Sequence, residues 1–207
     1  SINYNNPNAA NASANYILNT GNRYLCLCTY DRISDDGTDM LVMSFDDELS
    51  PSIKVLDGSF DEYARAIEAD GENSYLLLGN RVNTSSGKEE IVIYSVETNG
   101  LLVTGSTQIT TISETNANLR SARFVNLPGG SFGIVGTQEQ NGNSDIFLQF
   151  LLDDYQLGER VLFGASGDQT GVDIALPGDG SILLLGTNKI GDNSMISLLK
   201  TDLEGKL

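Results

Sequence analysis

One pattern recurs four times along this chain and restricts its fold more than any other feature. Apolar runs that end in a small residue occupy residues 25–28, 76–79, 132–136 and 183–186. Their last residues are 51, 57 and 50 positions apart, and each run is followed nine to twelve residues later by a second apolar run. A nearly constant period of this size is typical of repeat proteins, in which each unit buries its faces against its neighbours.

Each period contains several short runs typical of β-strands, separated by turns. In the third period, strands are predicted at residues 122–127, 131–137, 145–152 and 160–163, with a tight turn at Pro128-Gly129-Gly130. The middle strands are apolar on both faces, as expected for small sheets sandwiched between two others. We therefore predict an all-β fold, a β-propeller built from four-stranded antiparallel blades. A two-sheet sandwich is the alternative, but it needs no fourfold repeat.

The repeats divide the chain into predicted blades. They span residues 14–207, approximately as 14–58, 59–115, 116–167 and 168–207, and the Asn-, Ala- and Ser-rich residues 1–13 are predicted to form a flexible spacer. The fourth repeat stops before its outer strand. Either the N-terminal segment supplies that strand and closes the ring, or the natural protein continues into further blades. No run is long enough for a membrane helix, so no transmembrane segment is predicted in this chain.

Composition excludes several classes of function. The chain carries 12 Lys and Arg against 28 Asp and Glu, a net charge of −16. Phosphates would repel such a chain, so we expect no nucleic-acid partner. It has no histidine, the commonest general base and metal ligand. Its two cysteines, Cys26 and Cys28, are expected on one face of a strand, where a mutual disulfide is geometrically poor, so we predict two reduced, buried thiols.

The second repeat carries a recognisable pattern. From Asp61 to Gly100 it reads D-x-x-A-x-A-I, DG, YLLLG, EIVIY and NG, and the chain closes with K-T-D-L-E-G-K. This pattern resembles the propeller repeats of secreted bacterial proteins, over about residues 14–207, and especially those of surface lipoproteins of the Bacteroidetes type. The resemblance implies a cell-surface or periplasmic protein, anchored to the outer membrane through a segment not present in this chain.

Three functions are compatible with these observations. The first is a non-enzymatic binding or scaffolding module, which the resemblance extends to an accessory lipoprotein of an outer-membrane TonB-dependent nutrient importer, with a protein partner and a glycan or peptide ligand. The second is a glycan hydrolase or lyase that uses paired carboxylates such as Asp61 and Asp173. The third is a calcium-dependent adhesion module. We favour the first, without enzymatic activity or cofactor, because no intact catalytic motif occurs. The G-x-S-x-G match at Gly129 falls in a predicted hairpin.

The candidate binding residues follow from the predicted connectivity. Long loops after the second strands, and the crossings between blades, are expected at one end of the repeats, where binding residues are usually found. Tyr63, Arg81 and Arg120 are the side chains there that are best suited to anchor a partner. Asp61 and Asp173 are further candidates for ligand or partner binding.

The acidic loop at residues 35–39 is a weak metal candidate. Asp35, Asp36 and Asp39 surround a glycine, as in a fragment of a calcium loop. The full spacing and the terminal glutamate of that loop are missing, and the equivalent loops of the other repeats share its turn chemistry but not its carboxylates. We therefore predict no metal site.

Overall fold

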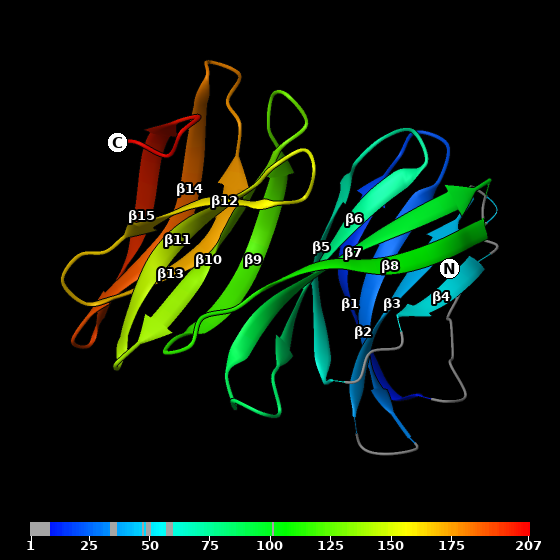
Figure 1. Ribbon diagram of the computed structural model, residues 1–207, viewed down its shortest axis with the longest axis horizontal. Coiled ribbons are helices and arrows are strands. Elements are labelled where there is room, and N and C mark those ends of the chain that lie inside the picture. The colour runs from blue at the N-terminus through cyan, green and yellow to red at the C-terminus, as the bar shows by residue number, and fades with distance from the viewer. Residues whose placement is uncertain (1–8, 34–36, 47, 49–50, 57–59, 101) are drawn as a thin grey trace. The chain divides into compact units, whose positions relative to one another are not determined.

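The chain forms β-sheets throughout the part that the structure describes. The computed structural model describes residues 9–33, 37–46, 48, 51–56, 60–100 and 102–207. The regular secondary structure in these ranges consists of fifteen β-strands, which form four antiparallel sheets (Figure 1). The predicted all-β class with four propeller blades is thereby confirmed. The sheets are named blades 1 to 4 in chain order.

Blades 1 and 2 are four-stranded meanders in which strands adjacent in sequence are hydrogen-bonded. Blade 1 consists of β1 (Ala9–Asn19), β2 (Tyr24–Arg32), β3 (Thr38–Phe45) and β4 (Pro51–Leu56). Blade 2 consists of β5 (Glu62–Ala69), β6 (Ser74–Val82), β7 (Glu89–Asn99) and β8 (Leu102–Ile112). Residues 62–69 have a helix-favouring composition, rich in Glu and Ala, but they form the strand β5 because their place in the repeat decides their structure.

Blades 3 and 4 repeat this order, but the last blade has one strand fewer. Blade 3 consists of β9 (Asn118–Asn126), β10 (Phe132–Gln140), β11 (Asn143–Leu151) and β12 (Leu157–Phe163). Blade 4 consists of β13 (Asp168–Ala175), β14 (Ser181–Ile190) and β15 (Asn193–Asp202). Among the described strands, β15 is hydrogen-bonded to β14 alone, and β1 is hydrogen-bonded to β2. β1 is therefore the first strand of blade 1, and the three described strands of blade 4 come from residues 168–202.

The chain divides into two compact units, each with its own core. Unit 1 comprises Ser1–Gly87 and Val92–Ile109, and unit 2 comprises Lys88–Ile91 and Thr110–Leu207. The core of unit 1 lies between blades 1 and 2 and includes Leu25, Leu27, Met40, Val42, Ile67, Leu77 and Val92. The core of unit 2 lies between blades 3 and 4 and includes Val135, Ile146, Leu148, Ile174, Ile182 and Leu184.

The same blade-to-blade contact builds both cores. In unit 1, β5 lies against β1, β2 and β3, and in unit 2, β13 lies against β9, β10 and β11. Small residues make this approach possible. A Cβ atom added to Gly186 would lie 2.5 Å from Ile146 Cδ1 of the preceding blade and 2.5 Å from the Thr170 carbonyl oxygen. Burial of aliphatic faces on both sides of a blade therefore depends on glycine or alanine at fixed places.

One boundary differs from the sequence-based expectations. β1 begins at Ala9, inside the predicted spacer, because this segment finds a partner in β2: Ala9 lies opposite Arg32 and Ala12 opposite Tyr30. The turn predicted at Pro128-Gly129-Gly130, by contrast, is present. Gly129 and Gly130 have φ values of 90° and 85° in the β9–β10 hairpin, so the G-x-S-x-G match lies in a hairpin turn and not in a nucleophile elbow.

Candidate functional site

Two buried carboxylates lie at the end of unit 1 that carries the β2–β3 and β6–β7 connections. Asp39, near the start of β3, is 1% exposed, and its Oδ1 atom accepts a hydrogen bond from Arg32 Nη1 at 2.7 Å. The Tyr30 hydroxyl donates to Asp39 Oδ2 at 3.2 Å. This carboxylate is therefore paired with a cation and a hydroxyl group, as a buried charge requires.

Glu62, at the start of β5, is fully buried in the same region. The Tyr94 hydroxyl donates to both of its oxygens, at 2.8 Å to Oε1 and 3.0 Å to Oε2. Burial raises the pKa of Glu62, and the hydrogen bond from Tyr94 and the nearby Arg81 cation offset only part of that rise. Burial likewise raises the pKa of Tyr94, and the Glu62 charge adds to it. Both side chains are buried away from solvent.

Sequence reasoning missed this pair. The chain has 28 Asp and Glu residues, and nothing in the sequence distinguishes Glu62 from the others. The useful signal is positional: it is the strand residue directly after the aspartate that begins the repeat pattern. A perturbed, buried carboxylate is a common mark of a functional site. Full burial of Glu62, however, suits a role in fixing the end of blade 2 better than contact with a substrate.

The predicted residues Asp61, Tyr63 and Arg81 gather around this end of unit 1. Asp61 Oδ1 accepts a hydrogen bond from the Thr38 backbone N–H at 2.9 Å, so its carboxylate ties β5 to β3. The Arg81 side chain is buried, with its guanidinium carbon 4.4 Å from the centroid of the Phe60 ring. Tyr63 remains 40% exposed. Asp61 and Tyr63 are therefore exposed, whereas Arg81 is buried.

Arg120 lies in unit 2, on β9, in an exposed ion-pair network. It contacts Glu89, and its Nη1 atom lies 3.0 Å from Glu139 Oε2. The Arg120 side chain is 43% exposed. Its charge is therefore already balanced by two carboxylates, which reduces what it can offer to an anionic partner.

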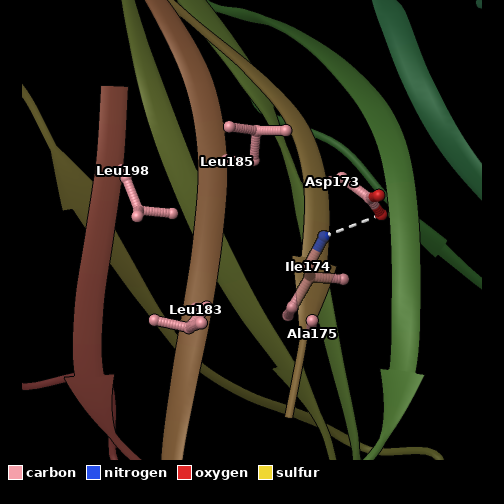
Figure 2. Close-up of a pocket in the computed structure, with 6 residues that line it drawn as sticks. All are labelled: Asp173, Ile174, Ala175, Leu183, Leu185 and Leu198. Atoms are coloured by element: carbon pink, nitrogen blue, oxygen red, sulfur yellow. Dashed lines mark hydrogen bonds between the residues drawn. The ribbon is translucent and has the colours of Figure 1, made fainter. Parts of the chain in front are cut away.

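Asp173 lies beside an open apolar hollow on blade 4. The hollow measures about 200 Å³, and Figure 2 shows the side chains that line it: Asp173, Ile174, Ala175, Leu183, Leu185 and Leu198. The Asp173 carboxylate accepts a hydrogen bond from the Ile174 backbone N–H at 2.9 Å. Asp61 and Asp173 belong to different compact units. Each accepts a hydrogen bond from a backbone N–H of its own unit.

The weak metal candidates Asp35, Asp36 and Asp39 do not form a metal site in the described residues. Asp35 and Asp36 lie outside the described residues, and Asp39 is occupied by Arg32 and Tyr30. Among the residues that the structure describes, no three His, Cys, Asp or Glu side chains are grouped so that they could hold a metal ion.

The two cysteines are free thiols, as predicted, but they differ in burial. Cys28 is buried, whereas Cys26 is half-buried, which corrects the expectation that both would be buried. Their sulfur atoms lie 3.5 Å apart. The hydrogen bond from Cys28 lowers the pKa of Cys26 to about 7, although burial opposes the shift. The same contact, together with burial, raises the pKa of Cys28.

Comparison with known proteins adds no assignment to this geometry. No helix in the described ranges is long and apolar enough to cross a membrane. No protein-family model matches the sequence, and no curated protein matches it.

Proposed function

We propose that this chain is a non-enzymatic binding or scaffolding module. The observation that carries the proposal is the use of its polar candidates: Asp61 and Arg120 are engaged in contacts that hold strands together, and Arg81 is buried against Phe60. Tyr63, at the loop end of unit 1, is 40% exposed and offers an aromatic surface to a partner. Aromatic and aliphatic anchors are typical of protein–protein contacts.

The setting in which such a module works follows from the sequence resemblance. We propose a place at the bacterial cell surface, as an accessory lipoprotein of an outer-membrane importer that pairs a TonB-dependent barrel with a lipoprotein. An acidic chain suits this place because it stays soluble and is repelled by anionic membrane surfaces. The partner surface is expected to include Tyr63.

The test is co-purification from native outer membranes. The tagged wild-type chain should recover a TonB-dependent barrel protein in a stable complex, and Tyr63→Ala should lose it. Leu102→Ala provides the matched control, because Leu102 is 61% exposed on β8 of the same unit and should leave the complex intact. Turnover of a glycan or peptide substrate by the chain alone, abolished by Asp61→Asn or Asp173→Asn, would show that the protein is an enzyme instead.

A further inference from the structure

Cys26 and Cys28 lie on the face of β2 that is turned away from blade 2. Leu27, between them, packs into the core between blades 1 and 2. Thr29 faces the same way as Leu27, because its Oγ1 atom accepts the Ala64 backbone N–H of β5 at 2.9 Å. Successive side chains of a strand point to opposite faces, so the two cysteines share the other face, which we call the outer face of blade 1.

A third sulfur-containing side chain lies on the outer face of blade 1, on the neighbouring strand. Met43 of β3 pairs with Cys26 in the antiparallel register. Residues that are opposite one another in this way have Cβ atoms about 4.5–5.5 Å apart. Met43 is 6% exposed and belongs to one apolar cluster with both cysteines. The chain has two cysteines and three methionines, and three of these five side chains meet here.

The repeat identifies the counterparts of the two cysteines in the other blades. Pairing with the first strand gives Leu77 and Gly79 in blade 2, Ile134 and Gly136 in blade 3, and Leu184 and Gly186 in blade 4. A shared hydrogen bond supports this alignment. The Oγ1 atom of Thr137, the residue after Gly136, accepts the Gly171 N–H of β13 at 3.1 Å. Thr29, the residue after Cys28, makes the same bond to β5.

Packing explains the glycines of the other blades but not the thiols of blade 1. An added Cβ at Gly79 would lie 2.5 Å from Met40 Sδ of the preceding blade. At Gly186 the same distance would separate it from Ile146 Cδ1 of blade 3. The fold therefore favours the loss of a side chain at this position and nowhere calls for sulfur. The grouping of three sulfur atoms in blade 1 points to a ligand that these atoms bind.

The spacing of the two thiols fits a metal ion with three ligands. The Cys26 and Cys28 Sγ atoms lie 3.5 Å apart. With metal–sulfur distances of about 2.3 Å, they would subtend an angle of about 100° at a shared ion. Separation by a further ~0.5 Å would bring that angle to about 120°, the value for three ligands in a plane. Met43 lies on the adjacent strand, and its three rotatable bonds let the thioether reach the third place.

The chemistry of these ligands selects Cu(I). Two thiolates and a thioether are soft donors, which suit Cu(I) better than hard cations. Structural Zn²⁺ takes four ligands, mostly from cysteine and histidine, and this chain has no histidine. The other members of the cluster are Tyr30, Leu41, Phe45, Ile53 and Val55. They form an apolar shell that limits the access of water to a bound ion.

We propose that Cys26, Cys28 and Met43 bind one Cu(I) ion on the outer face of blade 1. On binding, the two S–H bonds break, their protons pass to water, and two Cu–S bonds form, while copper stays in the Cu(I) state. The Met43 thioether adds a third bond without losing a proton. The ion can enter beside Cys26, which is half-buried and pairs with the 64% exposed Ile17. This inference goes beyond the proposed function and does not depend on it.

The experiment titrates the whole, reduced chain with Cu(I) in the absence of oxygen, and the ion is supplied as its coloured bicinchoninate complex. The wild type should remove one copper ion per chain from the complex, and native mass spectrometry should show one ion on a single chain of 22.2 kDa. Cys26→Ala and Cys28→Ala should each lose this uptake. Met43→Leu should weaken the affinity for Cu(I) at least about 10-fold, the lower end of the cost of changes around metal ligands.

Met40→Leu is the matched control. Met40 lies on the same strand as Met43 but packs into the core between blades 1 and 2, so this variant should bind Cu(I) like the wild type. Far-UV circular dichroism should show that every variant is folded. X-ray absorption at the copper edge should give three sulfur neighbours in the wild type and two in Met43→Leu.

Three results would overturn the proposal. The first is a wild type that leaves Cu(I) with bicinchoninate, or uptake that survives in the double variant Cys26→Ala and Cys28→Ala. The second is an affinity of Met43→Leu equal to that of the wild type, with two sulfur neighbours in both. The third is one copper ion shared by two chains, which would place the ligands in different molecules.

Discussion

Ile17 on β1 and Ile67 on β5 occupy the same position in the first strands of blades 1 and 2, six residues after Asn11 and Asp61 respectively. Their environments differ, so the two side chains allow the energy of the contact between blades to be measured. Ile67 is fully buried, whereas Ile17 is 64% exposed. Ile67→Ala removes three buried carbon atoms, and at about 0.8 kcal/mol for each the loss of transfer free energy is about 2.4 kcal/mol. The cavity left between two packed sheets raises the expected loss of unfolding free energy to about 3–5 kcal/mol. Ile17→Ala should change it by less than about 0.5 kcal/mol.

The assay is urea unfolding followed by far-UV circular dichroism. It should be run at a chain concentration at which light scattering gives the mass of one chain, so that association does not contribute to the midpoint. The slope with urea must stay constant for the shift in midpoint to report stability alone. A loss of unfolding free energy below about 1 kcal/mol for Ile67→Ala, or equal losses for the two variants, would refute the idea that the Ile67 side chain stabilises the contact between blades 1 and 2.

Three further changes test other parts of the structure. Gly186→Ala places a Cβ against atoms 2.5 Å away and should cost about 1–3 kcal/mol of unfolding free energy, whereas Gly105→Ala meets no atom within 4 Å and should be neutral by the same assay. Cys26, with its pKa lowered to about 7, should be alkylated by iodoacetamide well before Cys28, and equal rates by mass spectrometry would contradict this. Burial raises the pKa of Glu62 in the folded state above the ordinary 4.5. The wild type should therefore lose unfolding free energy relative to Glu62→Gln as the pH rises from 4.5 through the folded-state pKa. Plots of unfolding free energy against pH that run parallel for the two proteins would disprove the shift.

The fold could be predicted because its signal is repeated. One apolar run ending in glycine, as at Gly79, is ambiguous, but four at a steady spacing predict blades and override the helix-favouring composition around Ala66. The boundary at Ala9 could not be predicted, because the pairing partner of an Asn- and Ala-rich segment is a distant strand and not a local pattern.

The site was less predictable because its residues act through contacts between strands far apart in sequence. Glu62 looks like any acidic residue until Tyr94, 32 positions away, is seen to donate to it. Arg81 has the composition of a binding residue, but the Phe60 ring covers its guanidinium group. A side chain's type predicts what it can bind, whereas its accessibility depends on the packing of the whole blade.

The threonine bonds of Thr29 and Thr137 also bear on how such a gene can change in length. The Ala64 N–H of β5 donates to Thr29 Oγ1 of blade 1, and the Gly171 N–H of β13 donates to Thr137 Oγ1 of blade 3, so the contact has a direction along the chain. Duplication or loss of one whole repeat of 50–57 residues would pair a new N–H donor with a new acceptor oxygen of the same kind. An insertion that ends between the first and third strands would separate donor from acceptor. Natural variants of this protein should therefore differ in length by complete repeats. Recombinant proteins built from several repeats should fold when the repeats are fused at blade boundaries and fail to fold when they are fused within a blade.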